Sequence, residues 1–219
     1  MIKQNTEEAW LSVDEATDVV ASLAHFQRCR NLINEDSTAW KWAIISLHNA
    51  LQGSMTCHLA GTANLGCLSN KSASQWLEWN DKNRRGEIGW VHSPADEFGI
   101  VGRRPASKKD RVPRQYLANA KDMFDRLHKE NLRVEAGCGA VLPITLSQRG
   151  SFQILNNLRN QFTHFTPMGW SIEVSGLPTI FGDMLEVIRM IAADPWPFQH
   201  LDEANQKQLG QLLKHLTKA

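Results

Sequence analysis

The sequence predicts an all-α protein: a bundle of helices with one long, partly ordered excursion between the second and third helices. Two observations favour this class. Apolar residues recur at three- and four-residue spacing in six segments of the chain. Pro113, Pro167 with Gly169, and Pro195 fall between these segments, where helices are expected to begin or end. Alternation of the kind that permits a short strand is seen at Trp170, Ile172 and Val174, after the fourth helix.

Two helices are predicted in the first 59 residues. Residues Glu7–Cys29 carry apolar side chains at the spacing of a helix with one buried face. Asp36 or Ser37 can cap a second helix running to about Leu59, because short polar side chains accept hydrogen bonds from the first free N–H groups. Its buried stripe is expected to consist of Trp40, Ile44, Leu47, Leu51 and Met55.

Four more helices are predicted in the second half of the chain. They cover Arg114–Lys129, Leu146–Phe165, Leu177–Ala193 and Asp202–Leu216. Pro167 follows the second of these and Pro195 the third, and proline cannot continue a helix because it lacks the N–H group.

Residues 62–113, between the second and third helices, lack a sustained period. Gly, Ser, Asn and Pro recur there, and only Ser72–Trp79 indicates a short helix. A compact domain rarely holds about fifty unstructured residues, so this stretch is expected to be a loop-rich, partly ordered excursion. Because 219 residues suit one domain better than two small ones, we predict a single domain over residues 1–219.

Composition and charge exclude several classes of protein. With 42% hydrophobic and 21% charged residues, the chain can bury a core and is not disordered throughout. A formal net charge of +1 excludes a protein that coats nucleic acid by bulk charge, so any basic surface must be local. No apolar run approaches about 18 residues and no secretory leader is visible, which predicts a cytoplasmic protein without a membrane span.

The four cysteines indicate neither a disulfide framework nor a metal site. Cys29, Cys57, Cys67 and Cys138 are too few and too scattered for a framework. His58 adjoins Cys57, but no paired short spacing completes a zinc site. We therefore expect reduced thiols, no bound metal and no cofactor.

The predicted helix around Ser151–His164 has an unusual polar face. At about 100° per residue its apolar side chains gather on one arc, the expected core face: Leu155, Leu158, Phe162 and Phe165. The opposite arc carries amides and a histidine, with one Arg and one Thr at its edge: Gln153, Asn156, Asn157, Asn160, His164, Arg159 and Thr163. A solvated helix face normally shows Glu and Lys, which are better helix formers. We therefore expect this face to line a polar cleft or a subunit interface.

Within this face, Arg159-Asn160, three further residues and His164 resemble the Arg-polar-(x)n-His signature of the HEPN superfamily of helical bundles. The phrase Leu158–Phe165 is similar to what that family places on its penultimate long helix. The uncharged second helix, with Ser46–Gln52, also resembles the partner helix of such proteins. The resemblance covers the whole chain, as a stand-alone HEPN protein of the bacterial or plasmid type.

The resemblance implies a metal-independent endoribonuclease that leaves 2′,3′-cyclic phosphate ends, acting as a toxin or defence effector that a neutralising antitoxin restrains. Members of the family usually dimerise so that two motif helices build one RNA-cleaving site, so a homodimer is expected. Arg159 and His164 would be the catalytic pair, with Asn160 as the adjacent polar residue. Histidine can move protons near neutral pH, and a guanidinium can bind a phosphate oxygen as charge develops on it.

The spacing of the pair favours a site shared between subunits. Arg159 and His164 are five positions apart, about 140° around a helix, so they do not share a face. A two-fold axis removes this difficulty because each subunit contributes from its own side. His48 lies on the apolar stripe of the second helix and is interpreted as a satisfied core histidine, although its helix is the expected neighbour of the motif helix.

Basic residues cluster at the end of the excursion. This basic cluster comprises Arg103, Arg104, Lys108, Lys109, Arg111 and Arg114, against Asp110 alone. A solvated loop is the ordinary interpretation, and the functional hypothesis is that the cluster guides an RNA backbone. Trp76, Trp79 and Trp90 either stack on bases or anchor the loop by burial.

Two other functions stay open. The same fold can bind a nucleotide or another protein without catalysis, with the amide face as the docking surface. Alternatively, the uncharged second helix and the amide face form the interface of a structural dimer that has no ligand.

Overall fold

The structure is a computed structural model that describes residues 11, 13–95, 101–133, 138–164, 169 and 171–217. The described chain is mostly helical, with seven α-helices, two short 3-10 helices and one two-stranded antiparallel sheet. It divides into two compact units, the first formed by Met1–His58 with Gly139–Ala219 and the second by Leu59–Cys138. The single domain over residues 1–219 stays a prediction, because compactness does not show whether two units fold independently.

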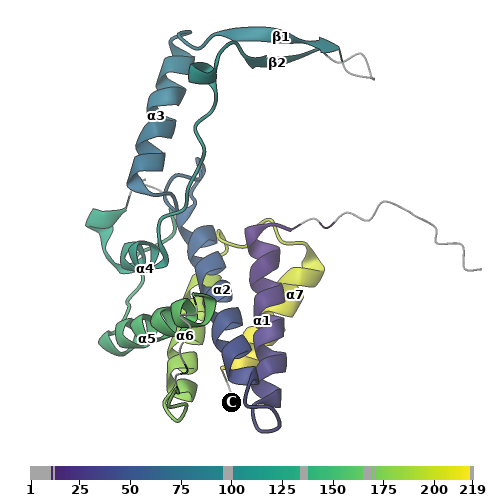
Figure 1. Cartoon of the computed structure of the whole chain (residues 1–219), viewed down its shortest axis with the longest axis vertical. Coiled ribbons are helices and arrows are strands. Elements are labelled where there is room, and N and C mark those ends of the chain that lie inside the picture. The colour runs from purple at the N-terminus through teal and green to yellow at the C-terminus, as the bar shows by residue number, and fades with distance from the viewer. Residues whose placement is uncertain are drawn as a thin grey trace, which may run out of the picture. The chain divides into compact units, whose positions relative to one another are not determined.

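Five helices build the first unit. They are α1 (Glu15–Leu32), α2 (Ala39–Leu59, whose last residue belongs to the second unit), α5 (Leu146–Thr163), α6 (Leu177–Ala192) and α7 (Glu203–Leu216). Figure 1 shows α1 and α7 side by side, and Arg30 of α1 donates to the carbonyl of Leu216 at the end of α7 (3.2 Å). None of the described helices is long and apolar enough to cross a membrane.

Aromatic rings and one glycine join α1, α2 and α6 in the core of this unit. Phe181 of α6 meets Phe26 of α1 edge to face, with ring centroids 5.2 Å apart, and Trp40 of α2 at 6.0 Å. A Cβ atom at Gly53 of α2 would lie 2.7 Å from Cγ2 of Val19 on α1, so glycine is needed for this close approach. Each buried aromatic or aliphatic side chain contributes about 1.5–3 kcal/mol of burial free energy, which holds the helices together.

Helix α5 packs against α6 and crosses it in Figure 1. Its first turn is fixed by a capping box, in which Thr145 accepts from the N–H of Gln148 (3.2 Å) and Gln148 accepts from that of Thr145 (2.9 Å). Ser147 and Ser151 donate their hydroxyls to the carboxylate of Asp183 on α6, at 2.8 and 2.6 Å. These polar contacts set the position of α5, which carries the predicted motif.

The second unit contains a helix, a hairpin and a smaller helix. Its elements are α3 (Asn70–Arg84), β1 (Trp90–Ala95), β2 (Val101–Pro105), η1 (Lys108–Asp110), α4 (Ala120–His128) and η2 (Glu130–Leu132). The strands are antiparallel, with Val91 opposite Arg104, and Figure 1 shows the hairpin beyond the C-terminal end of α3. Gly86, with φ of 72°, provides the left-handed turn that follows α3.

A buried arginine anchors the base of the second unit. Arg126 of α4 donates to the carbonyls of Gly66 (2.9 Å) and Leu68 (2.6 Å) and to the side chain of Asn70 (2.9 Å). It is 4% exposed, so it satisfies backbone acceptors that water cannot reach. Burial lowers the pKa of Arg126, and the charge of Asp122 opposes this shift.

Several predicted elements differ from the structure. Helix α1 begins at Glu15 because Asp14 caps it, and the residues predicted as helix from Glu7 to Trp10 lie outside the described part of the chain. Helix α4 begins at Ala120 and not at Arg114, because Asn119 caps it and Leu117 pairs with Leu68 as an extended bridge. In both cases a capping residue begins the helix later than the spacing of apolar residues predicts.

The predicted excursion is more ordered than expected. Residues 62–113 hold the 15-residue helix α3 and the β1–β2 hairpin, whereas the sequence pattern indicated only Ser72–Trp79. The strand permitted around Trp170–Val174 is wrong for 171–174, which are not strand, and Trp170 itself lies outside the described residues. Both strands of the described chain lie instead in the excursion.

Candidate functional site

The predicted motif lies at the C-terminal end of α5. The helix ends at Thr163, whose hydroxyl donates to the carbonyl of Arg159 (2.8 Å) and lies 3.3 Å from that of Asn160. His164 is the capping residue, with φ −121° and ψ 67°, and its N–H donates to the carbonyl of Asn160 (2.9 Å). The backbone of His164 is not helical. Its side chain therefore does not have to point about 140° around the helix from Arg159, as the five-residue spacing predicts for a continuous helix.

Arg159 and Asn160 are joined directly. Nη1 of Arg159 donates to the side-chain oxygen of Asn160 at 3.0 Å, and Arg159 is half-buried while Asn160 is exposed. His164 is exposed, and within the described residues it makes no side-chain hydrogen bond with Arg159 or Asn160. The amide of Asn160 therefore contacts the guanidinium and not the imidazole of His164.

Only part of the amide face reaches a neighbouring helix. Asn156 is half-buried and its side-chain oxygen lies 3.1 Å from Nε2 of His48 on α2. Gln153, Asn157 and Asn160 are exposed on the same helix. The core face follows the prediction at Leu155, which is fully buried, whereas Phe165 lies outside the described residues.

His48 is buried and neutral at pH 7. Its side chain is 1% exposed, and burial lowers the pKa of His48 to about 4. The hydrogen bond to Asn156 opposes this shift, and the charge of Arg159 adds to it. The predicted core position of His48 is therefore confirmed, and the structure links it electrostatically to the motif arginine.

Two buried nitrogen atoms beside this link have no hydrogen-bond partner among the described residues. They are Nδ1 of His48 and Nε of Arg159. Buried polar atoms are almost always paired in folded proteins, so each unpaired one calls for an explanation. The end of α5 and the facing part of α2 thus hold an available acceptor and an available donor.

The basic cluster belongs to the second unit. Arg103 and Arg104 lie on β2, Lys108 and Lys109 on η1, and Arg111 and Arg114 on the loop that follows; all six are exposed. Within the described part of the chain, none of the six forms an ion pair with a carboxylate. Because the motif residues belong to the first unit, an RNA path from the cluster to them stays a prediction.

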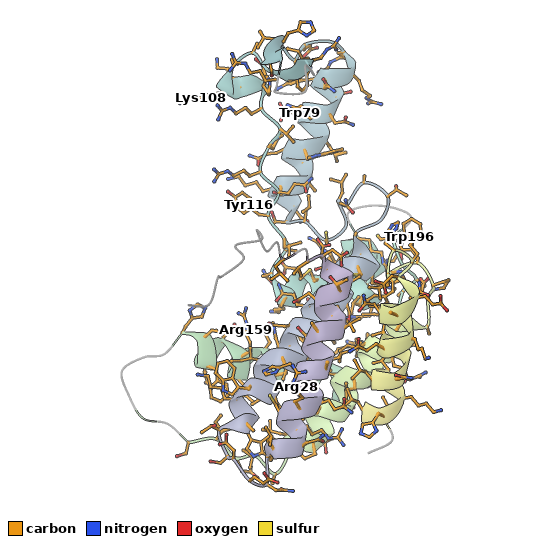
Figure 2. All side chains as sticks on the ribbon, turned by 90° about the vertical axis from the view of Figure 1, so that its right-hand side faces the viewer. Arg28, Trp79, Lys108, Tyr116, Arg159 and Trp196 are labelled. Atoms are coloured by element: carbon orange, nitrogen blue, oxygen red, sulfur yellow. The ribbon has the colours of Figure 1, made fainter. Side chains whose placement is uncertain are left out.

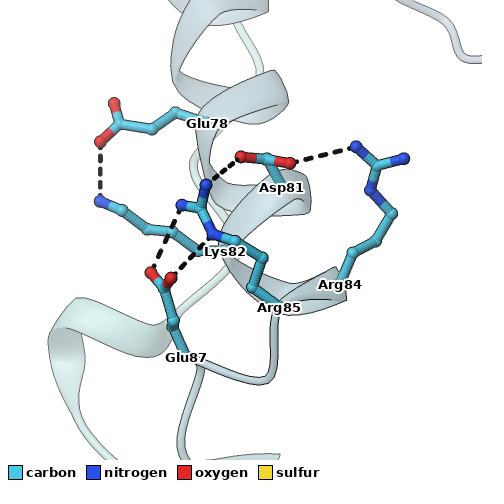
Figure 3. Close-up of polar contacts among 6 residues, drawn as sticks. All are labelled: Glu78, Asp81, Lys82, Arg84, Arg85 and Glu87. Atoms are coloured by element: carbon cyan, nitrogen blue, oxygen red, sulfur yellow. Dashed lines mark hydrogen bonds and ion pairs between the residues drawn. The ribbon is translucent and has the colours of Figure 1, made fainter.

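Neighbouring cations on α3 behave differently. Figure 3 shows a network in which Lys82 pairs with Glu78 (2.7 Å) and Arg85 with both Asp81 and Glu87 (2.7 Å each). Arg84 completes the network by contacting Asp81. Among the described residues, the second unit therefore separates ion-paired cations on α3 from a basic cluster that forms no ion pair, and this leaves the cluster available to an anionic ligand.

The tryptophans of the excursion divide between the two interpretations. Trp79 is half-buried and donates its Nε1–H to the carbonyl of Asp110 (2.9 Å). Trp90 is 40% exposed, donates to the side chain of Asn83 (3.1 Å) and meets Trp79 edge to face at 6.4 Å. Trp76 is half-buried on the same helix. Trp79 therefore anchors the loop, while Trp90 stays partly exposed to solvent.

No group of three or more His, Cys, Asp or Glu side chains suited to a metal ion occurs in the described ranges. All four cysteines are described, and none of them forms a disulfide. His58, considered with Cys57 as a ligand, has its Nε2 atom 2.8 Å from the carbonyl oxygen of Ala140. The described side chains thus give a metal no preformed cage.

Two features of the site were not recognised from the sequence. One is the contact of His48 with Asn156, for which the uncharged second helix and the amide face were the available signals. The other is a cavity of about 390 Å³ between α3 and the loop after η1, which Arg111, Arg114 and Tyr116 of the loop line. Comparison with protein-family models, curated proteins and solved structures finds no match to this chain.

Proposed function

We propose that this protein is a metal-independent endoribonuclease of the HEPN type, with a site that two subunits share. Arg159 and His164 are its catalytic pair, and Asn160 holds the arginine. The observation that carries the proposal is the end of α5. There the Arg159 guanidinium is braced by Asn160 beside a neutral, buried His48, and an exposed His164 follows at the helix terminus.

The residue types suit cleavage by the 2′-OH of RNA. The 2′-oxygen forms a bond to phosphorus as its proton passes to an imidazole. The P–O5′ bond then breaks, and the leaving 5′-oxygen takes a proton from a second acid. Two copies of His164, one from each subunit, provide a base and an acid, and Arg159 stabilises the charge on the non-bridging oxygens. The products are a 2′,3′-cyclic phosphate and a 5′-OH.

His48 and Asn156 act as positioning residues in this proposal. A neutral His48 leaves Arg159 as the cation on this part of α5, whereas a protonated His48 would repel it. The hydrogen bond between His48 and Asn156 joins α2 to the motif helix one turn before Asn160. The guanidinium is therefore oriented before RNA binds, which lowers the cost of binding the transition state.

Exposed apolar side chains on the two helices support the dimer. Ile154 of α5 is 47% exposed and Trp42 of α2 is 48% exposed. The exposed amides of α5 add polar groups that can pair across an interface without burying charge. A two-fold axis beside α5 would make the contact between subunits isologous and bring the two motif helices together.

Cleavage of RNA in excess chelator, with Arg159→Ala and His164→Ala as variants, tests the proposal. The wild-type protein is expected to release 2′,3′-cyclic phosphate ends, and each variant to lose at least about 100-fold in rate, since general acid–base catalysis contributes roughly 10²–10⁴-fold. His200→Ala, which removes an exposed histidine elsewhere in the first unit, is the matched control. Unchanged circular dichroism confirms that each variant is folded.

Other outcomes assign the other functions. RNA binding that needs Arg159, without cleavage, makes the protein a non-catalytic HEPN nucleotide-binding module. If neither substitution changes anything except dimer stability, the site is a structural interface. A toxin role adds a separate expectation: expression should arrest growth only while His164 is intact, and a co-expressed antitoxin should relieve the arrest.

A further inference from the structure

A cavity in the second unit combines aromatic walls with exposed cations. It has a volume of about 390 Å³, within the range of about 300–1,000 Å³ typical of ligand pockets. Trp79 and Tyr116 line it together with apolar side chains, and its rim carries Lys109, Arg111 and Arg114. It lies wholly in the second unit and shares no residue with the motif on α5.

Four hydrogen bonds fix the walls of this cavity. The indole of Trp79 donates to the carbonyl of Asp110 (2.9 Å), which attaches the loop near the C-terminal end of α3. Ser72 donates to the carbonyl of Arg114 (3.2 Å) and accepts from the N–H of Tyr116 (2.9 Å). The N–H of Ser69 donates to the carbonyl of Tyr116 (2.9 Å). The loop is therefore held along α3 at both ends, and in Figure 2 Lys108 and Tyr116 lie on the same side of α3.

Tyr116 is presented to solvent by this framework. Its side chain is 59% exposed, although its backbone is hydrogen-bonded on both sides. An exposed aromatic ring on a fixed backbone can receive a stacked base at low entropic cost. The exposed ring of Tyr116 therefore borders the polar cavity on a backbone that is held in place.

The charge around the cavity favours an anion. Lys109, Arg111 and Arg114 are exposed, and none of them pairs with a carboxylate among the described residues. The one acid that lines the cavity, Glu78, is already paired with Lys82 (2.7 Å), and nearby Asp110 accepts from the hydroxyl of Ser107 (2.7 Å). The second unit as a whole holds 14 Lys and Arg against 10 Asp and Glu, a net charge of +4 in a chain whose total is +1.

We propose that this cavity binds single-stranded RNA, with one unstacked base against Tyr116 and the flanking phosphates on Arg111 and Arg114. This inference rests on the proposed function in taking RNA as the ligand and names the strand state that the protein recruits. A base inside a duplex is stacked on its neighbours and cannot enter, so a duplex can use only the phosphate contacts. Gln75 lines the same cavity and offers an amide to a base edge.

Binding of 2′-O-methyl RNA by the full-length protein tests the cavity separately from catalysis. A labelled single strand of about 12 nucleotides falls within the site sizes of single-strand binding surfaces. Its methylated 2′-oxygens cannot attack phosphorus, so the strand stays intact whether or not the protein is a nuclease. Cleavage of unmodified RNA is measured in parallel on the same proteins.

Two pairs of variants define the expected result. Tyr116→Ala should weaken binding of the single strand about 5- to 140-fold, the effect of one lost stacking contact, whereas Tyr116→Phe should leave it unchanged. Arg111→Gln with Arg114→Gln should lower the salt dependence of binding by about 1.4 log units per log unit of salt, because each phosphate contact on a single strand contributes about 0.7. Lys71→Gln with Lys121→Gln removes two exposed cations outside the cavity and should preserve the dependence.

Each outcome decides one of the two proposals. Three outcomes overturn the proposal that the cavity binds single-stranded RNA, even when unmodified RNA is cut. They are equal binding of single strand and duplex, unchanged binding by Tyr116→Ala, and preference for a poly-glutamate peptide over RNA. Loss of single-strand binding in Tyr116→Ala supports the cavity even when unmodified RNA stays intact, in which case only the nuclease proposal fails. A single-stranded DNA of the same sequence shows whether the sugar contributes.

Discussion

Nε2 of His48 on α2 lies 3.1 Å from the side-chain oxygen of Asn156 on α5. Because an amide oxygen only accepts hydrogen bonds, Nε2 carries the proton and Nδ1 of the neutral ring is an acceptor. This contact ties the uncharged helix to the motif helix through a group that changes charge with pH. The stability of the first unit should therefore depend on the protonation of one buried histidine.

Acidification is expected to destabilise the protein through His48. Its pKa is lowered to about 4 in the folded protein from an ordinary value near 6.5. Between these values the unfolded chain binds the additional proton, so the free energy of unfolding falls as pH decreases, by on the order of 3 kcal/mol in total. Urea unfolding of wild type and His48→Gln at several pH values measures this effect. The free energy of unfolding of the variant should fall less on acidification than that of wild type.

The exposed histidine of α7 offers the control for this experiment. His215→Gln removes an imidazole that is exposed to solvent, so the stability of this variant should follow the pH dependence of wild type. If His48→Gln and His215→Gln lose stability equally on acidification, burial of His48 is not the source of the acid sensitivity.

The dimer proposed for α5 should be sensitive to a charge at Ile154. Ile154→Lys would place an ammonium group in an apolar contact, and burying an unpaired charge is costly, so the dimer should dissociate at least about tenfold more readily. Sedimentation velocity measures the change, and RNA cleavage should fall with the dimer fraction. Leu32→Lys alters a side chain that is equally exposed, at 47%, at the end of α1 and should have no effect. A monomeric wild-type protein that still cuts RNA would contradict the shared site.

Removal of Arg126 should destabilise the second unit. Arg126→Met leaves the carbonyls of Gly66 and Leu68 buried without a donor, and such a loss costs roughly 2–5 kcal/mol. Lys121→Met on the same helix removes an exposed cation of similar length and should change stability by less than about 0.5 kcal/mol. Hydrogen exchange of the α3 and α4 amides, compared between the two variants, locates the effect, and equal protection in both would contradict the anchoring role.

Two glycines should respond to alanine in opposite directions. A Cβ at Gly66 would lie 2.0 Å from the carbonyl oxygen of Leu59, so the backbone must shift and Gly66→Ala should lose about 1–3 kcal/mol. Gly150, inside α5, has no atom within 4 Å of an added Cβ. Gly150→Ala should gain about 0.5–1 kcal/mol from helix propensity. Thermal unfolding of the two variants distinguishes these expectations by the sign of the shift.

The helices of the first unit were predictable because their signals are local. The caps and periodic apolar positions of α5, α6 and α7 place these helices within about two residues of their observed ends. Helix α3 was predicted only over Ser72–Trp79 because its composition is polar, and salt bridges on its own surface accompany a small buried face at Ser72 and Ala73. Hydrophobic periodicity reveals a helix only where a stripe of apolar residues is buried, and α3 buries few residues.

The candidate sites divide in the same way. Arg159, Asn160 and His164 could be selected from the sequence because they lie within six consecutive residues. The contact between His48 and Asn156 joins positions 108 residues apart, and no pattern along one chain specifies such a pair. The cavity beside Tyr116 likewise depends on a loop held to α3 by backbone hydrogen bonds.

The sequence by itself determined the helical class, the amide face of α5 and the charge of the basic cluster, because periodicity, propensity and charge are properties of neighbouring residues. Only the tertiary structure decided that His48 is buried and neutral, that the basic cluster is free of ion pairs within the described chain, and that Tyr116 borders a cavity. Burial changes the cost of a charge, and distance decides which charges are neutralised. Both depend on which segments the fold brings together.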